Sequence, residues 1–139
     1  MVGKSIALAT LLAIQLFHPL VASRSARELP DLRIQRYEFV STNNKEIRVL
    51  VANDGKAVSK SCRLELSIRK INGVGATRTA FEMIPAIDSG KEVWITLTAS
   101  GILPSAISLK ETTFRLIADE TLIVAESNEN NNETWHNPN

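Results

Sequence analysis

The segment Cys62-Arg63-Leu64-Glu65-Leu66-Ser67-Ile68-Arg69 alternates between apolar and polar side chains along its whole length. In an extended strand, neighbouring side chains point to opposite faces of the sheet. One face of this segment is therefore apolar and the other is polar and charged, which is typical of an antiparallel sheet with one face in the core and one in water. The sequence predicts a strand here, with Cys62, the one cysteine of the chain, on its buried face.

Turn signals bound this segment on both sides and repeat further along the chain. Asn53-Asp54-Gly55 precedes it, and we expect a turn there because these residue types tolerate a positive φ. Asn72-Gly73 follows it, a pair that favours a tight two-residue hairpin. Asp88-Ser89-Gly90 is a third signal of the same kind. The spacing of these signals predicts short strands joined by tight turns.

Six further segments alternate in the same way, and they complete a set of seven predicted strands. The first changes parity between Ile34 and Tyr37, which predicts a β-bulge near Gln35-Arg36. In the strand before Pro85, we expect Phe81 and Met83 to face inward. The predicted strands are residues 32–39, 47–51, 62–69, 76–84, 93–97, 114–118 and 133–136. This pattern predicts an all-β fold, an immunoglobulin-like antiparallel β-sandwich.

The N-terminus has the three parts of a secretory signal. A positive charge at Lys4 comes first, an apolar run over 5–17 follows, and small residues occupy 21–23. The apolar run is shorter than the roughly 18–20 residues that span a bilayer. We therefore expect a signal peptide at 1–23, a linker at 24–30, the sandwich at 31–136 and a tail at 137–139. The mature protein is then periplasmic or extracellular, with no membrane span.

Composition excludes several classes of function. The chain has 139 residues with 16 Lys and Arg against 15 Asp and Glu, so it lacks the basic excess of a nucleic-acid-binding protein. The single cysteine cannot form an intramolecular disulfide, although an unpaired cysteine in an exported protein can link two chains. His136 is the one histidine after the signal peptide, and neither a phosphate-binding loop nor a metal-ligand motif is present. We expect no enzyme activity and no bound cofactor.

The acidic end of the chain offers oxygen ligands of the kind that calcium prefers. The calcium candidates are Asp119, Glu126, Asn128 and Glu129, although their spacing does not match a known calcium loop. The alternative is structural, because Asp and Asn side chains also accept hydrogen bonds from backbone N–H groups in turns.

Large apolar residues outside the strand pattern are candidates for partner binding. Trp94 is out of phase with its apolar neighbours and is expected to face outward, where an exposed Trp suits protein or sugar contact. Ile102 and Leu103 lie in a long apolar loop, and Trp135 lies near the C-terminus. The alternatives are a loop that packs over the open end of the sandwich and a Trp covered by arginine or lysine stems.

Several landmarks follow the order found in one bacterial family. They are Pro30-Asp31-Leu32, Val51-Ala52-Asn53-Asp54-Gly55, Ile84-Pro85-Ala86-Ile87-Asp88-Ser89-Gly90, Asp119, and Val124-Ala125-Glu126-Ser127-Asn128-Glu129-Asn130-Asn131. The sequence over 30–132 resembles the CARDB domain, the cell-adhesion-related domain found in bacteria. The resemblance implies an immunoglobulin-like module of exported proteins and does not imply enzyme activity. This chain departs from the family's usual context because it is a single module with a short last strand.

Two functional hypotheses follow. In the first, the protein is an exported binding or adhesion module that contacts a protein or glycan in the envelope or outside the cell. In the second, it is a periplasmic assembly or accessory factor that pairs a β-strand at an open sheet edge beside the short tail. We expect a monomer or a weakly self-associating protein. Neither hypothesis involves nucleic acid.

Overall fold

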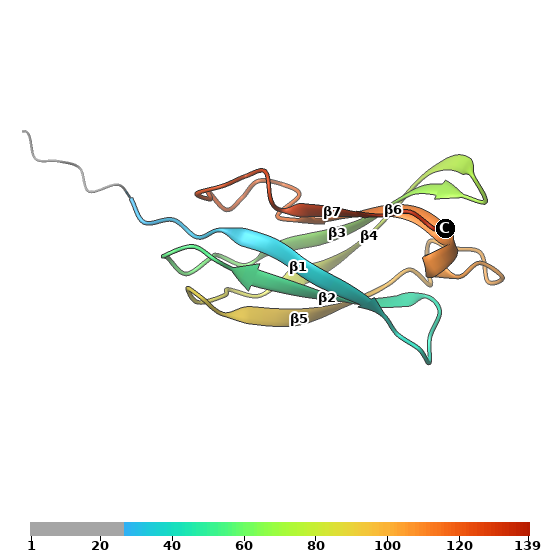
Figure 1. Cartoon of the computed structure of the whole chain (residues 1–139), viewed down its shortest axis with the longest axis horizontal. Coiled ribbons are helices and arrows are strands. Elements are labelled where there is room, and N and C mark those ends of the chain that lie inside the picture. Colours follow the sequence, from blue (N-terminus) through green and yellow to red (C-terminus); the bar gives the residue numbers. More distant parts are fainter. Residues whose placement is uncertain (1–26) are drawn as a thin grey trace, which may run out of the picture.

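The computed structural model describes residues 27–139, which form two antiparallel sheets packed face to face (Figure 1). In the first sheet the strand order is β1 (Leu32–Phe39), β2 (Glu46–Asn53) and β5 (Glu92–Thr98). In the second it is β4 (Val74–Ile84), β3 (Cys62–Ile71), β6 (Thr112–Ala118) and β7 (Glu133–His136). A short 3₁₀ helix, η1 (Leu109–Glu111), precedes β6. The predicted seven-stranded immunoglobulin-like sandwich is confirmed, and the expected signal peptide at 1–23 lies outside the described residues.

The core lies between the two sheets and consists mainly of aliphatic side chains. The apolar row of β3 is fully buried, as its alternation predicts. It lies beside the inner row of β6 in the same sheet and faces the inner row of β2 in the other. Burying one such side chain contributes about 1.5–3 kcal/mol relative to exposing it. The largest fully buried side chains are Phe114, Leu32, Ile47, Leu64, Leu66, Ile68, Ile84, Leu97, Leu109, Leu116, Val49 and Val51.

Two predicted backbone features are confirmed. The pairing of β1 with β2 shifts register between Ile34 and Arg36, which is the predicted bulge. Asn72 and Gly73, between β3 and β4, both have a positive φ, 50° and 74°, as a two-residue hairpin with a primed turn requires.

The turn at Asn53-Asp54-Gly55 forms for a different reason from the predicted one. None of its residues has a positive φ. Gly55 is required because a Cβ there would lie 2.4 Å from the carbonyl oxygen of Leu29. The glycine therefore allows two backbone segments to approach each other closely.

The prediction that Phe81 and Met83 face inward is wrong. In the β3–β4 register, Phe81 lies opposite Glu65 and Met83 lies opposite Arg63, both on the polar face of β3. Directly opposed residues share a face in an antiparallel pair, so both side chains point outward. The inward positions of this part of β4 are Ile84, Glu82, Ala80 and Arg78, which lie opposite the apolar row of β3.

The expected linker at 24–30 is partly packed. Residues 24–26 lie outside the described part, but Pro30 is buried. The carbonyl oxygen of Leu29 accepts the N–H of Lys56 at 3.0 Å, and that of Pro30 accepts the N–H of Ser127 at 2.9 Å. The sandwich thus begins before β1.

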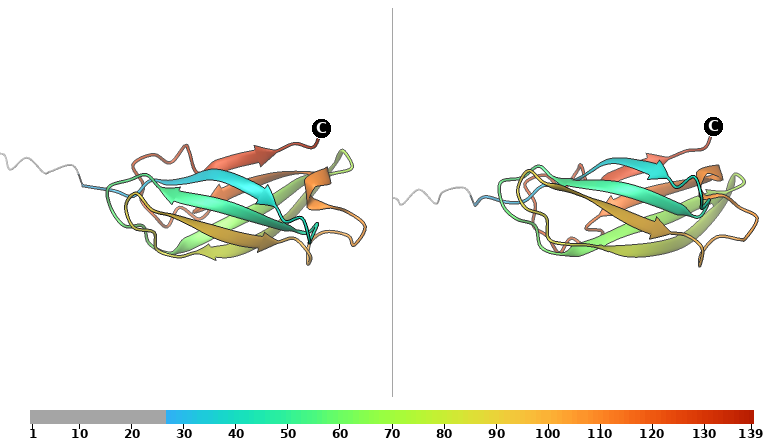
Figure 2. Two further views of the ribbon diagram at one scale, coloured as in Figure 1. Left: turned by 60° about the horizontal axis from the view of Figure 1, so that its bottom comes forward. Right: turned by 90° about the horizontal axis from the view of Figure 1, so that it is seen from below.

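The edge strands β1 and β7, one from each sheet, lie beside each other along one side of the sandwich (Figure 2). β4 and β5 approach each other along the other side. Among residues 27–139, no helix has the length and hydropathy needed to cross a membrane.

Candidate functional site

The outward side chains of β4, β3, β6 and β7 form one continuous surface, which we call the outer face. Three of them are large, apolar and exposed: Phe81 at 43%, Met83 at 53% and Trp135 at 44%. The strand register places them on a common face, because Phe81 lies opposite Glu65 and Trp135 lies opposite Arg115. The sequence predicts Trp135 as a partner-binding residue but not Phe81 or Met83, because the orientation of these two depends on the pairing of β4 with β3.

Arginine side chains cover the aromatic rings of the outer face. The guanidinium carbon of Arg63 lies 4.2 Å from the centre of the Phe81 ring, and that of Arg115 lies 5.7 Å from the Trp135 ring. Such contacts hold a cation over the negative face of the ring. Arg63 also donates to Glu120 at 2.6 Å. The face therefore presents aromatic rings and arginine planes together, the residue types that dominate protein interfaces.

Glu65 lies between these arginines and is 7% exposed. Burial raises the pKa of its carboxyl group, Glu120 raises the pKa further, and Arg115 and Arg63 oppose the shift. The centre of the outer face thus has a shielded carboxyl group, with exposed apolar side chains on either side.

Trp94 is less accessible than the outward-facing position suggests. It lies on the outside of β5 and is half-buried. The guanidinium carbons of Arg36 and Arg48 lie 5.3 Å and 4.5 Å from the centre of its ring. In the register, Trp94 lies opposite Leu50, which is only 4% exposed. Trp94 therefore packs in a small cluster on the first sheet, as the alternative interpretation holds.

The loop of Ile102 and Leu103 packs against the core, and the interpretation of Leu103 as a partner-binding residue is wrong because its side chain is buried. Leu103 belongs to the core and is 6% exposed, and Ile102 packs against the same core. The loop closes on itself because the N–H groups of Ile102 and Leu103 both donate to the carbonyl oxygen of Ala99, at 3.0 Å and 2.9 Å. The loop covers the open end of the sandwich.

The calcium candidates serve as hydrogen-bond acceptors in the turns before β7. The carboxylate of Asp119 accepts the N–H groups of Ile123 and Val124, at 3.0 Å and 2.7 Å. Asn128 accepts the N–H of Asn130 at 3.0 Å. Among residues 27–139, no three acidic, histidine or cysteine side chains come together as potential metal ligands.

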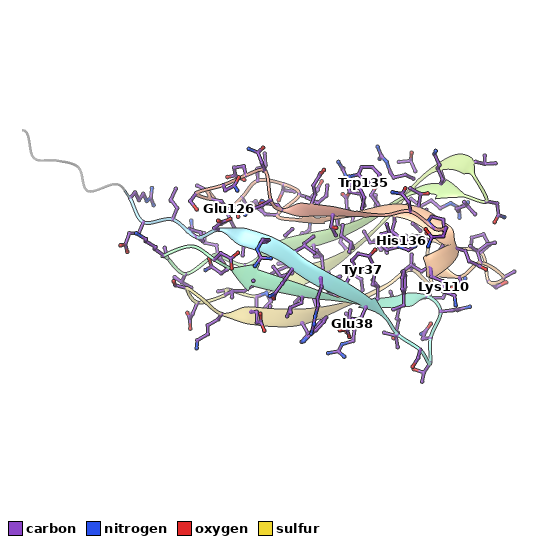
Figure 3. The ribbon with its side chains drawn as sticks, viewed as in Figure 1. Tyr37, Glu38, Lys110, Glu126, Trp135 and His136 are labelled. Carbon is purple, nitrogen blue, oxygen red and sulfur yellow. The ribbon has the colours of Figure 1, made fainter. Side chains whose placement is uncertain are left out.

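Glu126 and Glu129 connect the same turns to β1. Glu129 accepts the N–H of Glu126 at 3.0 Å. The carboxylate of Glu126 accepts the N–H of Leu32 at 2.5 Å and the amide of Asn132 at 2.8 Å. Burial raises the pKa of Glu126 to about 7, against the opposing effect of the Leu32 N–H. This carboxyl group fastens the start of β1 to the segment before β7 (Figure 3).

His136 joins β7 to β1 and to the core. Tyr37 Oη lies 3.0 Å from His136 Nδ1, and His136 Nε2 lies 2.9 Å from the carbonyl oxygen of Lys110. Because a carbonyl oxygen can only accept, Nε2 donates, and in the neutral ring Nδ1 accepts from Tyr37. The imidazole stacks on Phe114 with ring centres 4.8 Å apart. Figure 3 shows Tyr37 and His136 pointing toward one another, with Trp135 on the opposite side of β7.

Comparison with known proteins identifies the family. The family model of CARDB matches residues 29–136, which is most of the chain. The chain belongs to the CARDB family. Among solved structures, it is similar to the CARDB domain of a Pyrococcus furiosus protein in complex with di-metal ions. That match has 20% sequence identity and a TM-score of 0.52, and it covers 78% of this chain and 91% of that chain. A comparison with curated proteins found no match.

The motifs that identify this CARDB domain act structurally. Asn53 is fully buried. Its side-chain oxygen accepts the N–H groups of Asp31 and Gly55, both at 3.0 Å. Its amide donates to the carbonyl oxygens of Ala57 and Ile87, both at 2.8 Å. One side chain thus joins three backbone segments at this end of the sandwich, and Glu126 does the same for β1 and the final turns.

Cys62 is a core residue of the CARDB sandwich. It is 1% exposed, as its place in the apolar row predicts. Burial raises the pKa of the thiol to about 12. A thiol in this state is a poor nucleophile, because the reactive form is the thiolate.

Proposed function

We propose that this CARDB domain is an exported, non-enzymatic module that binds a protein or glycan partner in the envelope or the extracellular space. CARDB is an adhesion-related bacterial domain, which supports a binding role. The observation that carries the proposal is the outer face, where Phe81, Met83 and Trp135 are exposed beside Arg63 and Arg115. Exposed aromatic and arginine side chains that share a face contribute most of the energy in many interfaces.

The state of His136 supports the non-enzymatic part of the proposal. It is the one histidine among residues 27–139, and both of its ring nitrogens lie within hydrogen-bond distance of a partner in the fold. A general base must have a nitrogen free to reach its substrate. Here the imidazole serves to attach β7.

Affinity capture with outer-face variants tests the proposal. The full chain is expressed with a C-terminal tag and incubated with an envelope extract and with culture medium. We expect Phe81→Ala and Trp135→Ala to reduce recovery of the partner about tenfold or more, as for interface residues that contribute about 1.4 kcal/mol or more. Trp94→Ala, on the opposite sheet, is the matched control. Recovery that is unchanged by both variants, or lost only with Trp94→Ala, contradicts the proposal. A partner that survives proteolysis of the extract is a glycan.

The same capture, with and without calcium, tests the acidic end as a metal site. The similar Pyrococcus domain is in complex with di-metal ions. In this chain the oxygens of Asp119, Glu126, Asn128 and Glu129 already accept N–H groups. We therefore expect no change in capture or in Tm with calcium or with a chelator. A calcium-dependent rise in Tm would instead support these four residues as ligands.

Strand pairing beside the tail is the second candidate function. Its support is the shortness of β7, whose four residues pair with only Phe114–Ile117 of β6 and leave the start of that strand unpaired on this side within residues 27–139. An unpaired edge can accept a strand from an assembly partner. Glu133→Pro at the start of β7 would abolish capture under this alternative, whereas Trp135→Ala would leave capture intact. If the outer face is the binding surface, Trp135→Ala should instead reduce capture of the partner.

A further inference from the structure

The free edge of β4 is the longest of the four sheet edges in residues 27–139. β4 has eleven residues, and all but Ala76, Ala80 and Ile84 are exposed. The other edges are less suited to pairing: β7 has only four residues, and the bulge of β1 lies within the strand, between Ile34 and Arg36. The register shift of β4 lies near its hairpin end, between Gly75 and Arg78, and leaves residues 78–84 in regular pairing with β3. β5 is shorter, with seven residues, and its single charged residue, Glu92, cannot form an opposite-charge pair with a second copy of the strand. β4 has neither proline nor lysine, the residues that commonly protect sheet edges.

The sequence of β4 is complementary to itself in the antiparallel direction. The stretch Thr77-Arg78-Thr79-Ala80-Phe81-Glu82-Met83 can pair with a second copy about a twofold axis at Ala80. Arg78 then lies opposite Glu82 of the second copy, and Glu82 lies opposite Arg78. Thr79 lies opposite Phe81, and Thr77 lies opposite Met83. Opposite charges and aromatic–β-branched pairs are the cross-strand pairs that stabilise sheets.

The charges of Arg78 and Glu82 are available for this pairing. Neither side chain forms an ion pair with any residue in the described part of the chain. Arg78 donates one N–H to the carbonyl oxygen of Ile102 at 2.8 Å, which leaves other donors of the guanidinium free. Glu82 accepts only the N–H of its neighbour Met83, at 3.1 Å.

Charge also selects the register. Moving the twofold axis from Ala80 by one residue in either direction places both charges opposite apolar residues. Moving it by two residues places Arg78 opposite itself or Glu82 opposite itself, and like charges directly opposite are destabilising. Among these five registers, the one centred on Ala80 alone pairs each arginine with a glutamate.

We propose that two copies of this protein associate through antiparallel pairing of their β4 strands, with Ala80 at the twofold axis. The axis is perpendicular to the sheet, so the two β4-β3-β6-β7 sheets join into one, and the two outer faces lie on the same side. This association does not rest on the partner proposed above, although Phe81 and Met83 belong to both the outer face and the paired stretch of β4. It depends on the edge of β4 and does not require Trp135.

Charge-exchange variants test both the association and its register. The full chain is expressed, and the self-association of the purified product is measured by sedimentation equilibrium over a wide concentration range. Arg78→Glu and Glu82→Arg each place like charges opposite one another twice, so each is expected to weaken the dimer about tenfold or more. When the two variants are mixed, every opposed pair again has opposite signs. The mixture should therefore form a heterodimer, and the double variant R78E/E82R should dimerise alone.

The controls separate this inference from loss of folding. Lys56→Glu changes the net charge as much as Arg78→Glu does, in an exposed loop away from β4, and should leave the dimer intact. Heterodimer formation requires that both single variants be folded. A wild-type protein that stays monomeric at all concentrations overturns the proposal and leaves the edge to a strand of another protein. A dimer that neither charge variant weakens also overturns it, because another surface must then be the interface.

Discussion

At the scale of single residues, we expect Glu126 to make the stability of the fold depend on pH. It is 7% exposed, and it joins the Leu32 N–H to the Asn132 amide. Desolvation raises its pKa from 4.5 to about 7. The folded protein therefore binds a proton at this site more tightly than the unfolded chain does. Linkage then makes the unfolding free energy fall as pH rises between these two values.

The first prediction concerns this pH dependence. Stability from Glu126 should be fully present below about pH 4.5 and lost as pH rises through about 7. Each unit of pKa corresponds to about 1.4 kcal/mol, so the loss should be on the order of 3–4 kcal/mol. Glu126→Gln removes the ionisation, and the Asn132 amide, whose oxygen has no partner, can turn to accept from the new amide. The variant should be the more stable protein at pH 8. Urea unfolding between pH 5 and 8 measures both effects.

Other carboxyl groups near this site provide the control. Glu129 and Asp119 raise the pKa of Glu126, and Glu65 on β3 also has a raised pKa. In Glu126→Gln, the unfolding free energy should therefore still fall slightly as pH rises. Glu129→Gln, which changes an exposed neighbour, should retain most of the wild-type slope. Equal slopes in the wild type and Glu126→Gln would show that Glu126 does not titrate in this range.

At the scale of elements, β7 separates a structural role from a binding role on its two faces. His136 faces Tyr37 and Phe114, whereas Trp135 faces solvent beside Arg115. We predict that His136→Ala lowers the unfolding free energy by about 2–4 kcal/mol, through lost packing and two lost hydrogen bonds. Trp135→Ala should cost less than about 1 kcal/mol and should affect partner capture instead. Denaturant titration of both variants makes the comparison.

A finer variant isolates the hydrogen bond between the sheets. Tyr37→Phe keeps the aromatic packing and removes only the hydroxyl that donates to His136, so it should cost about 0.5–1.5 kcal/mol. If His136→Ala and Trp135→Ala were equally destabilising, β7 would not be held through its inner face, and the attachment described here would be incorrect.

The sequence predicts elements best where the two faces of a strand differ strongly. β3 is apolar on one face and polar on the other, so its orientation is clear without knowledge of its neighbours. β4 has apolar residues in both parities, with Ala80 and Ile84 in one and Phe81 and Met83 in the other. Only its pairing with β3 decides which parity is buried. The outer face was therefore not predictable from β4 alone.

Contacts between distant segments account for the rest of what the sequence did not reveal. Trp94 and Trp135 both occupy outward positions, but two arginines from β1 and β2 cover Trp94. The turn-forming role of the acidic residues was one of the two interpretations open, and the choice depended on where backbone N–H groups lie. The pairing of Tyr37 with His136 links the first strand to the last and has no local sequence signal.

At the scale of the whole molecule, the residues before β1 complete the end of the sandwich. Leu29 accepts hydrogen bonds from the loop after β2, and Pro30 is buried and accepts one from the final turns. Gly55 allows this close approach. Any processing of the N-terminus must therefore leave Leu29 and Pro30 on the folded chain. The expected cleavage after Ala22 or Ser23 satisfies this requirement, with several residues to spare.

The last prediction links processing to stability. If the expected signal peptide is removed on export, N-terminal sequencing of the mature protein should give a start at Ser23 or Arg24. A chain that starts at Asp31 would lack the acceptors for the N–H groups of Lys56 and Ser127, and would expose the pocket that Pro30 fills. It should be less stable by about 2–3 kcal/mol, at roughly 1 kcal/mol for each lost hydrogen bond together with lost burial. A chain that starts at Arg27 retains these contacts and is the matched control. Equal Tm values for the two shortened chains would place the true start of the sandwich at β1, and an exported protein that begins at Met1 would contradict cleavage.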